Sequence, residues 1–499
     1  MSETDSLKKI VKGSSIVFIG IFISKFLAYV YRLLIARVGP EQYGLFSIAL
    51  GLTGILVTIS VLGLNLGLMR YIPFFKGKED NEKILLTIRE SLKLTAAISL
   101  FFSILVFFLS EKISIGLFNN HELIPILKIM SLSIFFGTLT FMLYDLMIAF
   151  QKAKYHVLIK NFFENAIKIV LTFILIYIIG IGALGAAYGY LFSLIISLFV
   201  AIYMVNKYVF RFITIKKIYG GIKIRKELVS YSMPLMFSDL SISIIVWTDT
   251  LILGHFRSAT EVGIYNAALP TAHLMYLIPY ALMMLFLPVL TETYSKGEKE
   301  VLNSIYLRVT KWIFFTNLML VSFFVLFSRI IMKNLFGQEY ISGNIVLIIL
   351  SLGLFLGYLI EPTERMFMIF KKTKTIFLIT ISVLVSSLSL NFMLIPIYGM
   401  IGAAIAAAIT QILIFLLYAV SGYIITKINP FKFKYFLNAL ILLSVLGFIK
   451  YFFSGNLLIM LLMFMGYILL SILLLAITNI IEKEDILFIK LILKKISGN

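Results

Sequence analysis

Charged side chains lie inside long apolar runs of this sequence, where ionisable groups are costly and usually face a cavity or a partner. Lys25 and Arg32 lie in the first run, with Tyr29 between them at helical spacing. One face of this segment is therefore basic and aromatic, as a site for an anion would be. Arg32 also has a structural interpretation, in which it extends outward to the headgroups beside Arg37. Lys25 lies near the middle of its run, and we expect it to be the leading functional residue.

The fifth apolar run carries a second group of charges. Lys160, Glu164 and Lys168 follow one another at intervals of four residues, flanked by Asn161 and Asn165. This spacing predicts a ladder of ion pairs on one helix face. The ladder either neutralises itself on a buried face or forms the hydrated wall of a cleft.

The later runs add acids and single polar residues. Intramembrane carboxylates are the usual relays for H⁺ or Na⁺, so Asp239, Asp249 and Glu361 are candidates to bind a coupling ion. Arg365 follows Glu361 by four positions and can pair with it. His273 is a candidate for substrate contact, although a lone histidine is more often a hydrogen-bonded packing residue.

The sequence lacks the residues of catalytic and metal sites. It has no cysteine, its four histidines have no metal-ligand spacing, and no phosphate-binding loop motif is present. No connection exceeds roughly twenty-five residues, which is too short for a separate folded domain. We therefore expect neither an enzyme nor an ATP-driven pump, and no metal or cofactor beyond H⁺ or Na⁺ as a coupling ion.

Apolar runs long enough to cross a bilayer, about 20 residues, recur along the whole chain. Of its 499 residues 61% are hydrophobic and 14% charged, against roughly 45–50% and about 25% in soluble domains. We expect an all-α membrane protein with about fourteen transmembrane helices. The first run lacks a cleavage pattern, so we expect it to remain as the first span.

Lysine and arginine gather in alternate connections. With a cytoplasmic N-terminus, the inside segments carry 33 of the 44 basic residues and the outside loops carry 6. This distribution follows the positive-inside rule, and it predicts a multi-pass plasma-membrane protein with both termini cytoplasmic. Because the net charge of +20 is spread between apolar runs, where it meets anionic headgroups, we expect no nucleic-acid partner.

Three motifs recur at nearly one offset. They are 42–49 and 261–268, 150–154 and 370–374, and 182–187 and 399–404. Each copy would hold six spans, an even number, so the copies enter the membrane in the same direction and are related by a pseudo-twofold axis along its normal. We expect an N-lobe over 1–205, a basic cytoplasmic connector over 206–227, a C-lobe over 228–426, two further spans over 427–481 and a cytoplasmic amphipathic tail over 482–499.

Several stretches resemble one family of transporters. SKFLAYVYRLLIARVGPEQYGLFSIA, at 24–49, looks like the opening of polysaccharide-transport flippases of the multidrug/oligosaccharidyl-lipid/polysaccharide exporter superfamily. GLNLGLMRYIPFF at 63–75 and WTDTLILGHFRSATEVGIYNAA at 247–268 are similar to further signatures of that group. The resemblance is closest to O-antigen flippases and sporulation-type lipid II flippases.

The resemblance implies two lobes that rock between inward-open and outward-open states. It also implies a substrate whose sugars ride on a polyprenyl phosphate or pyrophosphate, held by basic residues of a central cavity. We expect a monomeric flippase that moves a lipid-linked oligosaccharide from the cytoplasmic to the outer leaflet, in contact with membrane lipids and polysaccharide-assembly proteins. The residues expected to contact the substrate are Lys25, Tyr29, Arg32, Glu164, Lys168, His273 and Arg365.

Two other functions stay open. The first is a cation-coupled exporter of drugs or metabolites from the same superfamily. That branch typically carries an acid in the first span, whereas this sequence has none between Lys12 and Arg37. The second is a non-transporting membrane scaffold, which would have no reason to keep charges inside its spans.

Overall fold

The protein is helical in the computed structural model, which describes residues 20, 22–210, 221–430, 433–451, 457–482 and 485. No β-strand occurs in these ranges. Nine helices within the described parts are long and apolar enough to cross a membrane. The predicted all-helical membrane class is therefore confirmed. The number of fourteen spans stays a prediction.

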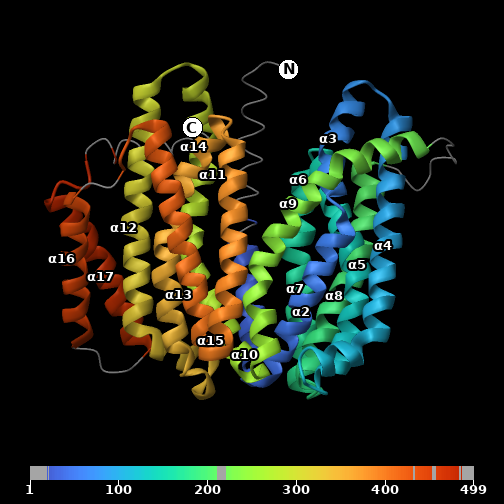
Figure 1. Cartoon of the computed structure of the whole chain (residues 1–499), viewed down its shortest axis with the longest axis horizontal. Helices are drawn as coiled ribbons and strands as arrows, with labels where there is room; N and C mark the ends of the chain where they lie inside the picture. Colours follow the sequence, from blue (N-terminus) through green and yellow to red (C-terminus); the bar gives the residue numbers. More distant parts are fainter. Residues whose placement is uncertain are drawn as a thin grey trace. The chain divides into compact units, whose positions relative to one another are not determined.

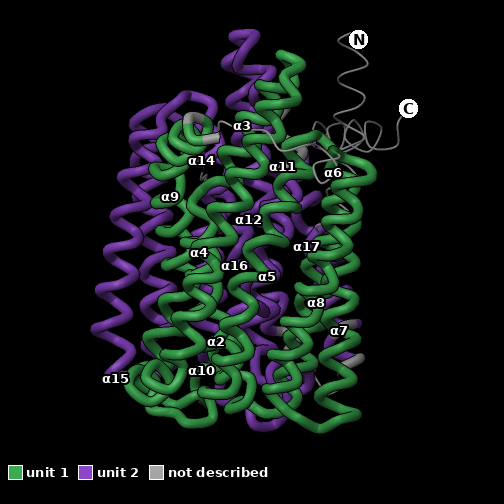
Figure 2. The backbone as a smooth tube through the Cα atoms, turned by 90° about the vertical axis from the view of Figure 1, so that its right-hand side faces the viewer, with its two compact units in different colours: residues 1–266 green, residues 267–499 purple. Residues whose placement is uncertain are grey.

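The chain forms two compact units, residues 1–266 and 267–499, which Figure 2 colours separately. The most deeply buried described span of the first unit is α5, which packs against α2, α3, α4 and α8. This unit contains a helix over 22–36, followed by α2 (Pro40–Val61), α3 (Leu64–Gly77), α4 (Asn81–Gly116), α5 (Leu123–Ala149), α6 (Ala153–His156), η1 (Val157–Phe163), α7 (Glu164–Phe173), η2 (Ile174–Ile178), α8 (Gly182–Met204), η3 (Val205–Val209), α9 (Gly221–Phe256) and the first part of α10 (Ala259–Ala272).

In the second unit α12 packs against α11, α13, α16 and α17. The elements of this unit follow the rest of α10 and are η4 (His273–Tyr276), α11 (Leu277–Ser295), α12 (Lys299–Ile331), η5 (Met332–Phe336), η6 (Gln338–Tyr340), α13 (Gly343–Tyr358), α14 (Glu361–Ile369), α15 (Thr373–Thr426), α16 (Phe433–Tyr451) and α17 (Leu457–Ile477). Figure 1 labels most of these helices.

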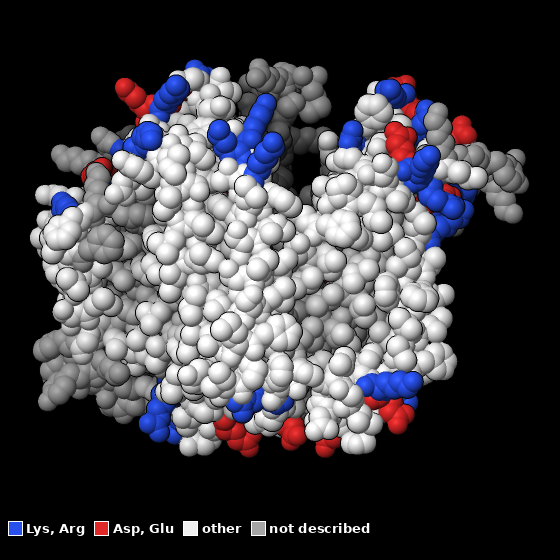
Figure 3. All heavy atoms as spheres, in the orientation of Figure 1, with Lys and Arg blue, Asp and Glu red and all other residues white. Residues whose placement is uncertain are grey.

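Charged side chains are confined to the ends of the helices on the face shown in Figure 3. Between the ends lies a broad uncharged band. Such a band is what hydrocarbon requires of a lipid-facing surface, because a charged side chain is costly at that depth. The exposed surface therefore agrees with the composition in assigning this chain to a membrane.

The first unit extends beyond the predicted N-lobe boundary at 205. This happens because α9 packs against α2, α3 and α4. The predicted lobes follow from the sequence repeat and not from packing, so their boundaries stay a prediction. Residues 211–220 of the predicted connector lie outside the described residues, as does most of the predicted tail over 482–499.

The repeated motifs share a positive φ angle at two pairs of matching positions. Gly182 and Gly399 hold matching places in one pair of motifs, and both have a positive φ, of 54° and 56°. Gln151 and Lys371 match in a second pair, and their φ angles are 60° and 57°. Positive φ is uncommon for residues other than glycine, so agreement at both places is strong support for a repeated unit. The superposition of the two complete halves by a twofold rotation stays a prediction.

The third pair of motifs meets directly. Gly44 of α2 lies against the backbone of Ala259, and the matching Gly263 of α10 lies against the backbone of Pro40. A Cβ atom added at either glycine would overlap the carbonyl oxygen of its neighbour. The contact is reciprocal, as a local twofold axis between two copies requires. Glycine at both positions lets α2 and α10 approach closely.

Candidate functional site

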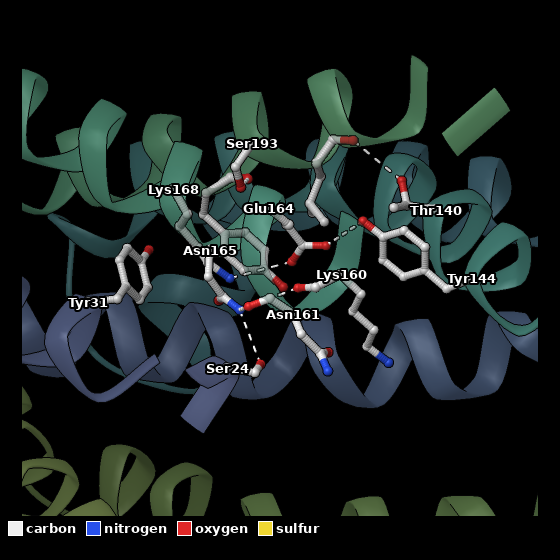
Figure 4. Close-up of polar contacts among 12 residues, drawn as sticks. Ser24, Tyr31, Thr140, Tyr144, Lys160, Asn161, Glu164, Asn165, Lys168 and Ser193 are labelled. Carbon is white, nitrogen blue, oxygen red and sulfur yellow. Dashed lines mark hydrogen bonds and ion pairs between the residues drawn. The ribbon is translucent and has the colours of Figure 1, made fainter. Parts of the chain in front are cut away.

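The first unit brings the helix over 22–36 beside α7 and the π-helical turn η1. Gly20 permits this approach, because a Cβ atom there would overlap the Val157 side chain. Asn165 of α7 is buried and donates a hydrogen bond of 3.2 Å to Ser24 Oγ. Figure 4 shows this bond beside the charged residues of the fifth apolar run. The two helices are thus linked next to Lys25.

The ladder predicted for the fifth run is only half formed. Lys168 Nζ lies 3.5 Å from Glu164 Oε1, and the other carboxylate oxygen accepts a hydrogen bond of 2.8 Å from Tyr144. Lys160 has no carboxylate within 4.0 Å among the described residues. The reason is η1, in which the Glu164 N–H bonds to Ile159 O, five residues back. A π turn takes residues four apart out of line, and such turns are frequent at functional sites.

The two lysines of the fifth apolar run make cation–π contacts with aromatic rings. Lys168 Nζ lies 5.3 Å from the ring centroids of both Tyr31 and Tyr190. Lys160 Nζ lies 4.9 Å from the Phe141 centroid. Cation–π contacts hold a charge without neutralising it. The aromatic rings therefore help to position both lysines, and Lys168 in addition pairs with Glu164.

Lys25 and Arg32 belong to the same basic group. Lys25 is exposed and Arg32 half-buried, and Lys25 lies close enough to Arg32 and to Lys160 to be repelled by each of them. Arg32 shares a side-chain hydrogen bond with the buried Tyr43, which holds it within the unit. Tyr29 is half-buried one turn from Lys25.

The basic cluster, defined as Lys25, Arg32, Lys160 and Lys168, has the Glu164 carboxylate at ion-pair distance, and the carboxylate of Asp145 on α5 also attracts Lys160. Four cations against these two carboxylates leave an excess of two positive charges. At an effective dielectric constant of 20, each close pair with an anion is worth about 4 kcal/mol at 4 Å. Charge-assisted bonds to phosphate are short and strong. The positive excess of the cluster therefore suits an anion such as a phosphate group.

The second unit gathers a different set of predicted residues. Arg365 pairs with Glu361 at 3.2 Å, as the spacing predicts, and Tyr276 also hydrogen-bonds to Glu361. His273 Nδ1 lies 2.5 Å from the hydroxyl of Tyr358. The rings of Tyr276 and Tyr358 are 5.0 Å apart, so these residues form one cluster. The predicted substrate contacts therefore fall into two groups, one in each unit.

The sequence of this chain matches the profile of one known protein family. The profile of the family described as "Polysaccharide biosynthesis protein" matches residues 10–294, more than half of the 499 residues. The chain belongs to this family.

Curated relatives agree with that membership. An uncharacterized membrane protein of Methanocaldococcus jannaschii is 25% identical over 417 residues, covering 80% of this chain and 81% of the relative. The capsular polysaccharide biosynthesis protein CapF of Staphylococcus aureus is 27% identical and covers 48% and 61%. A probable low-salt glycan biosynthesis flippase of Haloferax volcanii, Agl15, is 27% identical and covers 37% and 39%.

Solved structures share the fold of this family member. The lipid II flippase MurJ in an inward closed conformation superposes with a TM-score of 0.74, at 22% identity, over 95% of this chain and all of MurJ. An inward-facing multidrug resistance transporter of the MATE family superposes with a TM-score of 0.69, at 19% identity, over 81% and 96%. These two structures show the fold of the chain, while the family profile confirms the predicted resemblance to polysaccharide-transport proteins.

The three predicted ion-coupling acids do not form one site. Asp249 is buried and accepts a hydrogen bond of 2.6 Å from Tyr265. Asp239 is half-buried on the same helix, α9, and ten residues separate them, about 15 Å along the axis. Glu361 belongs to the second unit. No group of three potential metal ligands occurs among the described residues.

Sequence reasoning missed the residues that hold the cluster in place. Tyr31, Tyr144 and Tyr190 lie on three different helices, and no spacing along the chain predicts that they meet the lysines. Asp145 is buried on α5, hydrogen-bonds to Asn65 and attracts Lys160. The sequence does carry a signal for Asp145, because it is a lone aspartate in a long apolar run.

Proposed function

We propose that this family member is an alternating-access flippase. It moves an oligosaccharide linked to a polyprenyl phosphate or pyrophosphate from the cytoplasmic to the outer leaflet for cell-surface glycan assembly. The observation that carries the proposal is the basic cluster of the first unit, whose positive excess suits the phosphate of such a lipid. The flippase and polysaccharide-biosynthesis names of its relatives support the same substrate class.

The phosphate, the sugar and the prenyl tail of such a substrate would each contact different groups. Lys25, Arg32 and Lys160 compensate the phosphate charge, with arginine able to hold two oxygens at once and lysine acting as a point charge. Glu164 and the tyrosines beside it offer acceptors and donors to sugar hydroxyls. The prenyl tail stays in the lipid, since moving it through a polar site would cost the free energy of its transfer from hydrocarbon.

We also propose a coupling ion, a membrane orientation and protein partners for this flippase. H⁺ or Na⁺ drives the cycle through the carboxylates of Asp239, Asp249 or Glu361. Both termini are cytoplasmic, and the protein is a plasma-membrane monomer that works beside polysaccharide-assembly proteins. The distribution of basic residues supports the topology.

One observation favours a second function. In the second unit Glu361 and Glu364 lie near one arginine, Arg365, which leaves an excess of one negative charge. An acidic surface would suit an organic cation, as in a cation-coupled exporter, and the MATE-family neighbours share the fold. We favour the flippase because the basic cluster is larger and an exporter of cations would be hindered by it.

The purified chain in liposomes separates the two functions. A lipid-linked oligosaccharide is placed in one leaflet, and its arrival in the other is followed with a membrane-impermeant lectin. In parallel, the uptake of an organic cation such as ethidium is measured. We expect transfer of the lipid-linked sugar without ethidium uptake. Ethidium transport without sugar transfer would assign the protein to the exporters.

A further inference from the structure

A pocket of about 400 Å³ opens in the second unit. Tyr306 of α12, Thr363 of α14, and Phe415, Val420 and Tyr423 near the end of α15 are among its lining residues. The volume lies in the range of pockets that hold small ligands. No charged residue in the described part of the second unit lines it, so its lining differs from the cluster around Glu361.

The interior of the pocket suits hydrocarbon. Its buried polar groups, the Tyr306 hydroxyl and Thr363 Oγ1, lie 3.0 Å apart and satisfy each other. Asn429, which also lines the pocket, has a partner of its own. The other lining residues are leucine, isoleucine, phenylalanine, alanine, valine, tyrosine and proline. A sugar would find few hydrogen-bonding groups here, whereas an alkyl chain needs none.

One wall of the pocket is apolar and exposed at the surface of the second unit. Val420, Tyr423 and Ile424 are 59%, 55% and 60% exposed, and they lie on α15, whose composition is that of a membrane span. Apolar side chains exposed on a span contact lipid tails. A lipid chain can therefore enter the pocket directly from the membrane.

A cation lies at the same end of α15. Lys427 ends this helix, is exposed, and has its Nζ 5.9 Å from the ring centroid of the lining residue Tyr423. Lys432 and Lys434 follow within the next seven residues. Basic residues next to a span attract anionic headgroups, and the lysine distribution predicts that this end is cytoplasmic.

We propose that the pocket holds one resident anionic phospholipid. An acyl chain lies against Phe415 and Val420, and the phosphate lies beside Lys427. The inference requires only that the chain spans a membrane, and it does not rest on the proposed flippase function. A resident lipid here would fill the space between α12, α14 and α15.

Native mass spectrometry of the full-length purified chain tests this site. The protein is titrated with phosphatidylglycerol and with phosphatidylcholine carrying the same acyl chains. We expect one tightly retained phosphatidylglycerol. Val420→Trp fills the mouth of the pocket and should weaken retention of that lipid about tenfold. Lys427→Gln should weaken phosphatidylglycerol about fivefold, as one interfacial lysine predicts, and weaken phosphatidylcholine less, because the choline cation offsets the charge of its phosphate.

Two matched variants serve as controls. Val385→Trp makes the same change on α15 at a residue of similar exposure, 57%, that does not line the pocket. Lys333→Gln removes an exposed lysine from η5. Both should bind lipid as the wild type does. Three results would overturn the proposal: undiminished retention by Val420→Trp, equal loss in Val385→Trp, or one-for-one displacement by polyprenyl phosphate, which would assign the pocket to the substrate tail.

Discussion

A disulfide across the contact of α2 with α9 should stop transport reversibly. The two helices belong to different copies of the repeat, and alternating access requires the copies to move apart on each side in turn. Thr58 Oγ1 of α2 lies 3.2 Å from Ser243 Oγ of α9. The chain has no cysteine, so Thr58→Cys with Ser243→Cys introduces the only thiols.

The geometry of the contact favours formation of this bond. An S–S bond is about 2.05 Å long, so the two side-chain atoms need to approach by about 1.1 Å. The longer C–S bonds supply part of that distance. The crosslinked residues are 185 positions apart, and a disulfide over a loop of that length stabilises the folded state by about 5 kcal/mol in the chain-entropy treatment, because it constrains the unfolded chain. The link is covalent, so thermal motion at the contact will not open it.

The assay is transfer of lipid-linked oligosaccharide in liposomes, before and after reduction. We expect the oxidised double variant to be inactive and the reduced variant to recover. A matched control joins α9 to α10 within one copy through Thr250→Cys and Asn266→Cys, whose side chains lie 3.1 Å apart. Its activity should not depend on oxidation. Equal rates for the oxidised and reduced Thr58→Cys, Ser243→Cys protein would show that this contact stays closed throughout the cycle, and the reasoning would be wrong.

Three further changes test separate parts of the structure. Glu164→Gln removes the carboxylate beside Lys168, so it should lower the free energy of unfolding by about 1–3 kcal/mol. It should also tighten the binding of polyprenyl phosphate, because the cluster loses a negative charge. Both quantities can be measured in detergent, and weaker binding would contradict the role of the positive charge. Gly44→Ala should lower stability by about 1–3 kcal/mol through overpacking, whereas Gly77→Ala, with open space around it, should not, and equal unfolding midpoints would refute the close contact. Glu361→Gln should abolish any response of transport to imposed H⁺ or Na⁺ gradients, and a response equal to that of the wild type would remove Glu361 from the coupling mechanism.

The helical membrane class was predictable because the length of an apolar run is enough to indicate a span. The repeat was inferred from the shared offset between motifs, and it stays a prediction. The positive φ angles of Gly182 and Gly399, 54° and 56°, support it at one pair of matching positions. The contact between Gly44 and Gly263 was not predictable, because no single-sequence rule says that two matched glycines also touch.

The pairs of Glu164 with Lys168 and of Glu361 with Arg365 were predictable from their spacing, whereas the separation of Lys160 from Glu164 was not. Lys25, Arg32 and Lys168 were found because charges inside a span are expensive. The ladder was predicted with ideal α-helical spacing, and the π turn before Glu164 separates Lys160 from it. The tyrosines that hold the lysines come from distant parts of the chain, and only tertiary packing brings them together.

The central claim is that the cations of the first unit hold the phosphate of a lipid-linked sugar. The most direct test is the sidedness of that lipid in cells that depend on this protein, using Lys25→Ala with Arg32→Ala. We predict that the double variant is made at normal levels and leaves the lipid in the cytoplasmic leaflet, while Lys128→Ala, an exposed lysine of α5, behaves as the wild type. Wild-type flipping by the double variant would show that these two cations do not carry the substrate, and the site assignment would be wrong.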